Sequence, residues 1–176
     1  MLGIGIFKGL AVTALNFFGS YFSKSRLVTV QYPEAGNTIT PFSRNIPFLL
    51  YDNEAADPLE SIRCVSCKIC EKECPPQCIY IAQDKDANGK LIKRPKVFDI
   101  DISVCMGCQI CVEVCPFEAI KMDSYFELAS GDRYEGLLLH REDLMKSNSY
   151  FHQIHPDEAR DVDNKLAAKQ KKPVAA

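Results

Sequence analysis

Residues 64–75 read CVSCKICEKECP, and residues 105–116 read CMGCQICVEVCP. Both stretches follow one pattern, C-x2-C-x2-C-x3-C-P, and residue 105 repeats residue 64 at an offset of 41 positions (105 minus 64). Cysteines at this spacing bind iron–sulfur clusters of the [4Fe–4S] type. The chain is therefore predicted to hold two [4Fe–4S] clusters and to carry electrons.

The pattern also predicts how the cysteines are shared between the clusters. In proteins with two such runs, the fourth cysteine of each run binds the cluster of the other run. The expected ligands of the first cluster are Cys64, Cys67, Cys70 and Cys115, and those of the second cluster are Cys105, Cys108, Cys111 and Cys74. This exchange would tie the two halves together.

Each repeat also predicts a local structure. Three cysteines lie in a loop, the fourth opens a short helix, and apolar residues after it cover the cluster. The candidates for this apolar shell are Pro76, Ile79, Phe117 and Ile120. Gly107 lies where the backbone approaches the cluster closely, and Ser66 takes that place in the first repeat.

Zinc and disulfides are the alternatives for a chain with nine cysteines. A structural zinc site needs four ligands, commonly in paired C-x2-C knuckles, which leaves the third cysteine, the x3 spacing and the prolines unexplained. A zinc-stabilised interaction module therefore remains a weaker alternative. A disulfide framework does not need such regular spacing, and the sequence indicates a reducing compartment.

Composition excludes some functions. The formal net charge is −2, from 21 basic and 23 acidic residues, so the chain is not a basic nucleic-acid binder. It has no Gly-rich phosphate loop and no nucleophile motif, so no catalytic residue and no directly bound small-molecule substrate are expected.

The predicted fold is α+β: a bacterial two-[4Fe–4S] ferredoxin-like core with an N-terminal amphipathic helix and irregular N- and C-terminal extensions. The expected parts are an amphipathic membrane-surface helix (1–26), an extended arm (27–58), the duplicated ferredoxin domain (59–123), an extension with a short helix (124–150) and a charged tail (151–176).

Strands are expected at 27–33, 79–81 and 97–100, with Asn88-Gly89 as the turn between the last two. Residues 33–58 look irregular and are expected to wrap over a neighbour. A helix is expected over 137–146, and residues 165–176 are expected to be a mobile tail or a strap on a partner.

Residues 1–23 predict a helix with two faces. Small and polar residues share one arc, and apolar residues share the other: Phe7, Leu10, Ala11, Ala14, Leu15, Phe18, Tyr21 and Phe22. The segment is long enough to span a membrane, but its polar arc with Lys8 and Asn16 favours a helix on the membrane surface. Packing on a protein partner or on the chain's own core remains an alternative.

Three residues outside the predicted ligand sets are considered as further metal-binding candidates. Cys78 is interpreted as a small buried residue rather than a ninth ligand or redox thiol. His152 and His155 are spaced for a metal pair on a helix, but no third ligand accompanies them, so a solvated tail is expected.

The chain resembles the subunit I family of respiratory complex I, the proton-translocating NADH:quinone oxidoreductase. The resemblance covers roughly residues 5–150 and rests on TVQYPE at 29–34, the two cysteine runs, YFELA at 125–129 and EDL at 142–144. The cysteine runs alone are shared with many ferredoxins. The chain departs from the family at Cys78, at 84–96 and after about residue 150.

The resemblance implies a translocase subunit in the peripheral arm, beside the membrane arm, with other subunits of both arms as partners. Its clusters would pass single electrons from the large iron–sulfur subunit towards the terminal cluster and quinone. We expect it on the cytoplasmic face of a bacterial inner membrane rather than in a mitochondrial matrix, because no Arg-rich transit peptide precedes the helix. The alternatives are a diffusible two-cluster ferredoxin and the equivalent subunit of a membrane hydrogenase or ferredoxin-driven quinone reductase.

Overall fold

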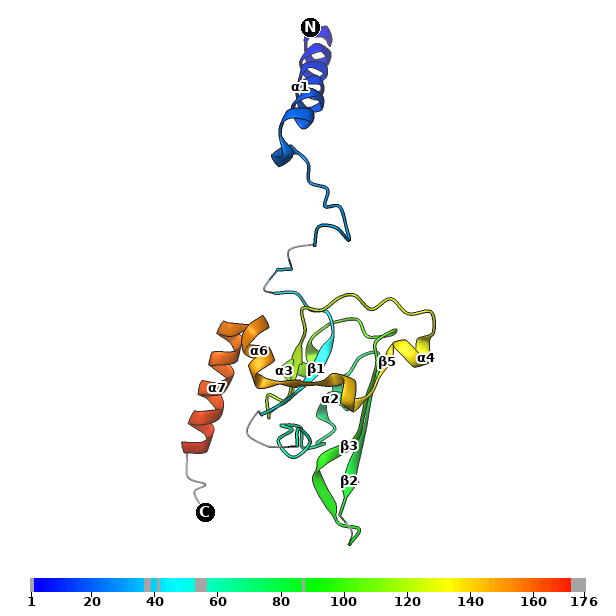
Figure 1. Ribbon diagram of the computed structural model, residues 1–176, viewed down its shortest axis with the longest axis vertical. Helices are drawn as coiled ribbons and strands as arrows, with labels where there is room; N and C mark the ends of the chain where they lie inside the picture. The colour runs from blue at the N-terminus through cyan, green and yellow to red at the C-terminus, as the bar shows by residue number, and fades with distance from the viewer. Residues whose placement is uncertain (1, 37–38, 41, 53–56, 87, 172–176) are drawn as a thin grey trace. The chain divides into compact units, whose positions relative to one another are not determined.

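The computed structural model describes residues 2–36, 39–40, 42–52, 57–86 and 88–171 (Figure 1). The chain divides into two compact units, Met1–Thr38 and Ile39–Ala176. The second unit contains all nine cysteines.

The first unit is mainly the predicted N-terminal helix, α1 (Leu2–Phe22), followed by the short 3₁₀ helix η1 (Lys24–Arg26). The stretch Gly3–Phe22 is long and apolar enough to cross a membrane, judged by length and composition. None of its described side chains is buried. The Arg26 guanidinium folds back along the helix and donates to the Leu15 carbonyl at 3.3 Å.

The strand predicted at 27–33 is wrong. Residues 27–31 have no regular structure, and a turn follows them. Val28 is 94% exposed. A run rich in β-branched residues becomes a strand only where another strand pairs with its backbone, and none pairs with this segment among the described residues.

The second unit contains two three-stranded sheets. The first has the order β4–β1–β6 and consists of β1 (Pro47–Tyr51), β4 (Ile120–Met122) and β6 (Met145–Ser147). Strand β1 is central: it pairs antiparallel with β4, Leu49 opposite Ile120, and parallel with β6, Leu49 opposite Met145.

The second sheet has the order β2–β3–β5. It consists of β2 (Ile79–Lys85), β3 (Leu91–Asp101) and β5 (Leu138–Leu139). The predicted hairpin is confirmed and is longer than expected: β2 and β3 form the long green hairpin of Figure 1. Gly89 in its turn has φ +76°, which glycine adopts without strain. Ala87 in the same turn lies outside the described residues.

Strand β1 corrects the expectation that 33–58 is irregular. Its residues from Pro47 to Leu50 are all buried, because one face packs towards the cysteines and the other towards the C-terminal helices. A strand buried on both faces reads as a continuous apolar run, so it lacks the alternation that marks a half-exposed strand.

The short helices α2 (Ile69–Glu73) and α3 (Ile110–Glu113) correct a second expectation. Each contains the third cysteine of its run, and Cys74 follows α2 as its C-terminal cap. The fourth cysteine therefore follows the helix of each repeat, as the cap of α2 or just after the cap of α3, and does not open a helix.

The C-terminal part is more ordered than predicted. The single helix expected over 137–146 is replaced by β5, α5 (Arg141–Leu144) and β6, and α4 (Arg133–Gly136) precedes them. The predicted tail contains α6 (Asn148–Ile154) and α7 (Pro156–Lys171), which lie beside each other in orange and red in Figure 1. Residues 172–176 lie outside the described part.

Two hydrophobic clusters lie on opposite faces of β1. The cysteine-side core contains Leu49 with Ile79, Ile81, Phe98, Ile100, Ile120 and four of the cysteines. The helix-side core consists of Phe48, Leu50, Phe151, Ala159 and Val162. The helices α6 and α7 therefore complete the domain that positions the cysteines.

Candidate metal centres

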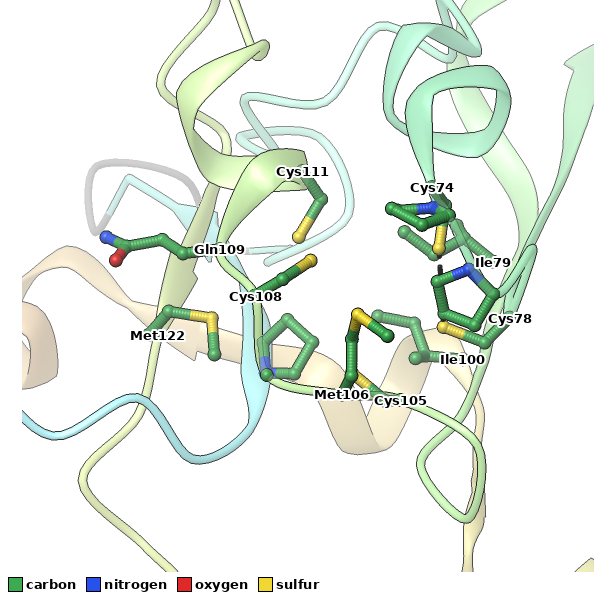
Figure 2. Close-up of a pocket in the computed structure, with 14 residues that line it drawn as sticks. Cys74, Cys78, Ile79, Ile100, Cys105, Met106, Cys108, Gln109, Cys111 and Met122 are labelled. Atoms are coloured by element: carbon green, nitrogen blue, oxygen red, sulfur yellow. Dashed lines mark hydrogen bonds between the residues drawn. The ribbon is translucent and has the colours of Figure 1, made fainter.

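Two apolar cavities bring the predicted ligands together. The first is lined by Cys74, Cys105, Cys108 and Cys111, and Figure 2 shows these four side chains around one open space. Cys74 comes from the end of α2, and the other three come from the loop before α3 and from α3 itself. Three cysteines of the second run thus meet the fourth cysteine of the first.

The second cavity mirrors the first. It is lined by Cys64, Cys67, Cys70 and Cys115. The shell residues predicted from the sequence are confirmed as lining residues: Pro76 and Ile79 in the first cavity, and Phe117 and Ile120 in the second.

The two repeats share an unusual backbone. Positive φ angles occur at three positions of the first repeat, Ser66, Lys68 and Gln77, and at the same positions of the second, Gly107, Gln109 and Glu118. Five of these six residues are not glycine, so the left-handed conformation has a steric cost there. The same strained path in both repeats indicates that the loops are shaped by what they surround.

Gly107 has a second constraint besides its φ of +60°. A Cβ atom built on it would lie 3.1 Å from the Arg44 carbonyl oxygen. Glycine is therefore favoured here by its φ angle and by the backbone before β1, and the predicted close approach to the cluster stays a prediction.

Backbone amides in these loops favour charged sulfur atoms. The amide of Ala119 donates to the Cys115 Sγ at 3.4 Å, and the amides of Ser66 and Gly107 lower the pKa of Cys64 and Cys105. Amide donors stabilise thiolates and sulfide in the same way, so the turn conformation serves a negatively charged centre.

Burial opposes ionisation of the cysteines by themselves. Desolvation, together with the neighbouring cysteines, raises the pKa of the Cys64 thiol to about 11 and those of Cys70 and Cys111 to about 12. Metal ligation requires thiolates. The sites therefore suit a group whose own positive charge removes these protons.

The sulfur atoms are spread around a space instead of meeting at a point. Within the described part of the chain, no three or more His, Cys, Asp or Glu side chains converge closely enough to hold one metal ion. A zinc ion needs four ligands at about 2.0–2.3 Å. Four cysteines around a wider cavity fit a cubane of iron and sulfide instead.

Comparison with known proteins identifies the family of this chain. Residues 63–119 match the 4Fe-4S dicluster domain. NADH-quinone oxidoreductase subunit I 1 of Geobacter metallireducens is 39% identical over 140 residues, covering 80% of this chain and 72% of that protein. The chain belongs to the NADH-quinone oxidoreductase subunit I family.

Two other members of the family are also similar to this chain. NADH-quinone oxidoreductase subunit I of Campylobacter fetus is 38% identical over 134 residues, covering 76% of this chain and 78% of that protein. Subunit I 2 of Streptomyces coelicolor is 32% identical over 155 residues, covering 82% and 68%. As a subunit I protein, this chain holds two [4Fe–4S] clusters and carries electrons, as its cysteine runs predicted.

Cys78 is buried, as predicted, but it is more than a packing residue. Its Sγ lies 3.5 Å from the Sγ of Cys74. The interaction with Cys105 and burial hold the pKa of Cys78 above its usual range, and the same interaction lowers the pKa of Cys105. The spacing of Cys78 after Cys74 was the available signal for this contact.

The expectation of a solvated tail at the two histidines is wrong. His152 lies in α6, with its Nε2 atom 2.7 Å from the Asp163 carboxylate, and His155 packs edge-on against the Phe151 ring. The His152 contact joins α6 to α7, and the His155 contact lies at the C-terminal end of α6.

Proposed function

We propose that this chain relays single electrons inside a membrane-bound NADH–quinone oxidoreductase, with one cluster in each cysteine-lined cavity. The observation that carries the proposal is the crossed grouping of the cysteines, three from one run and the fourth from the other, in both cavities. Each bound cluster supplies a site that takes up and gives back one electron.

The protein's first task is to keep the two sites close. Cys70 of one set and Cys111 of the other are electrostatic neighbours, and the helices that carry them, α2 and α3, pack together. Because each run contributes a ligand to both sites, one half of the core does not separate from the other without breaking ligation. This arrangement supports electron exchange between the clusters inside one domain.

The second task is to keep water away from the sulfur atoms. Ile79, Ile100 and Met122 wall the first cavity, and Leu49, Ile81 and Phe98 wall the second. A hydrophobic shell controls solvent access and local dielectric, and through them the reduction potential. No side chain has to move a proton or form a bond for this function.

A relay also needs contact with a donor and an acceptor. Cys67 of one set is exposed, and Met106 beside Cys105 of the other is 65% exposed. Each cavity therefore has an edge near the surface of this chain. We propose that neighbouring subunits of the peripheral arm cover these edges and bring their own redox centres close, one to deliver electrons and one to pass them towards quinone.

The N-terminal unit is proposed to seat the subunit on the membrane. Helix α1 exposes large apolar side chains along its length, among them Phe7, Leu10, Leu15 and Phe18, with Lys24 and Arg26 at its end. Such a helix binds a membrane surface through its apolar face and anionic headgroups through its cations. We place it on the cytoplasmic face of a bacterial inner membrane, beside the membrane arm, and a diffusible ferredoxin does not need this helix.

The crossed ligation is tested with four single variants in the anaerobically purified complex. Cys115→Ala and Cys67→Ala are expected to remove the same electron paramagnetic resonance (EPR) signal, because both residues line one cavity. Cys74→Ala and Cys108→Ala are expected to remove the other signal. Loss of the same signal in Cys115→Ala and Cys108→Ala would instead assign each run to its own cluster and refute the proposal. Iron and sulfide assays confirm that each variant lost one cluster.

A further inference from the structure

The two repeats differ at one position beside the clusters. Cys78 follows the fourth cysteine of the first run by four residues, and Ala119 follows the fourth cysteine of the second run by four residues. Both residues are buried, with 8% and 2% of their surface exposed. The duplicated fold therefore holds a thiol in one half where the other half has only a methyl group.

The thiol touches one of the ligands of one cavity. The Cys78 Sγ lies 3.5 Å from the Cys74 Sγ, and Figure 2 draws this contact as a dashed line at the wall of the first cavity. Cys78 and Cys105 line the same cavity. At the matching place, Ala119 offers Cys115 only its backbone amide.

We propose that the Cys78 thiol donates a hydrogen bond to the Cys74 ligand and thereby raises the reduction potential of the cluster held by Cys74, Cys105, Cys108 and Cys111. The inference rests on the ligand sets proposed above. Cys78 would act as a positioning and tuning residue and not as a ligand.

The direction of the bond follows from the ligand's role. A cysteine that binds iron does so as a thiolate and has no proton to donate. The proton between the two sulfur atoms therefore belongs to Cys78.

The sign of the effect follows from electrostatics. Reduction adds one negative charge to the cluster and its ligands, so a donor stabilises the reduced form more than the oxidised form. Hydrogen bonds to cluster sulfur are a recognised determinant of potential. A thiol is a weak donor, but the buried, apolar surroundings strengthen its electrostatic contribution.

The test is a redox titration of the complex, in which EPR follows both clusters. Cys78→Ala is expected to lower the reduction potential of the cluster whose EPR signal Cys74→Ala removes. The equilibrium constant for its one-electron reduction should fall by about threefold to tenfold, where tenfold corresponds to about 59 mV. Cys78→Ser keeps a donor and should restore most of the wild-type potential. Ala119→Ser adds a donor near Cys115 and should raise the potential of the other cluster.

The outcomes separate this inference from the ligand assignment. Unchanged potentials in Cys78→Ala, with Cys74→Ala still removing the expected signal, would overturn the tuning role and leave the assignment intact. A shift of the signal that Cys67→Ala removes would overturn the assignment instead. If Cys78→Ala fails to assemble, Cys78→Ser and Ala119→Ser test the donor role instead. The role is supported if Cys78→Ser keeps the wild-type potential and Ala119→Ser shifts the potential of the other cluster upward. An unchanged potential in Ala119→Ser contradicts it.

Discussion

Lys121 is a buried charge that joins the cluster-binding core to the C-terminal helices. Its side chain is only 4% exposed. Its Nζ atom lies 2.8 Å from the Glu118 carboxylate and 3.0 Å from that of Glu158 in α7, and 5.5 Å from the centre of the Phe151 ring. One ammonium group thus links β4, α6 and α7.

The two sides of this ion pair are not equivalent. The side chains of Glu118 and Glu158 are 20% and 46% exposed, so water solvates them when the lysine is gone. The Lys121 ammonium group is buried, so water cannot solvate it in the same way when both carboxylates are gone. We therefore expect Glu118→Gln/Glu158→Gln to cost about 3 kcal/mol of unfolding free energy, and Lys121→Met about 1 kcal/mol or less. Urea denaturation of the anaerobic holoprotein, followed by circular dichroism, measures both; a larger loss for Lys121→Met would contradict the argument.

At the scale of residues, the sequence predicts what chemistry dictates and misses what packing dictates. The spacing that a cubane requires suggested eight candidate ligands, and these cysteines line two cavities in the predicted groups. Their ligand role stays a prediction. The left-handed turns at Lys68 and Gln109 could not be predicted, because neither residue favours that conformation. The burial of Lys121 could not be predicted either, because its partner Glu158 is distant in the sequence.

At the scale of elements, α7 (Pro156–Lys171) covers the outer face of β1. Ala159 and Val162 of this helix are buried against Phe48 and Leu50 of the strand. The opposite face of the same strand carries Leu49 towards the cysteines. The helix therefore protects the strand that supports the cluster cavities without contributing a ligand.

This arrangement predicts a selective effect of a buried charge. Val162→Asp should destabilise the domain by roughly 3 kcal/mol, because an unpaired carboxylate enters an apolar contact. Asn164→Asp adds the same charge at an exposed position of the same helix and should change stability by less than about 0.5 kcal/mol. The two variants are compared by their rates of limited proteolysis and by their urea midpoints. Iron content should stay near wild type in both variants, and equal proteolysis rates would argue against a packed α7.

The elements that the sequence predicted correctly are those with a local signal. The hairpin of β2 and β3 follows from β-branched runs around Asn88-Gly89, and α1 follows from its length and periodicity. Strand β1 has no alternation because both of its faces are buried. The short helices of the tail depend on the helix-side core, which forms only when residues 48–50 and 151–162 meet.

The whole molecule consists of two units. The unit Ile39–Ala176 contains both proposed ligand sets and both hydrophobic cores, and the unit Met1–Thr38 contains the exposed apolar helix. If the helix attaches the chain to a membrane as proposed, cluster binding and membrane attachment should be separable by mutation. The length of α1 allows it either to lie on the membrane surface or to cross the membrane, so the helix itself has to be tested face by face.

A surface helix and a spanning helix respond differently to charges on their two faces. Leu10→Asp/Phe18→Asp places two carboxylates on the apolar arc, and Asn16→Asp/Ser20→Asp places two on the polar arc. A helix on the surface buries only the apolar arc, so we expect the first variant to lose vesicle binding and the second to keep most of it. A spanning helix would be impaired in both variants, since a carboxylate near the membrane centre costs about 2.5–3.5 kcal/mol wherever it faces.

Flotation of the anaerobic full chain with phosphatidylglycerol-containing vesicles distinguishes the two cases. Iron content serves as the control, because an unchanged value shows that only membrane attachment was lost.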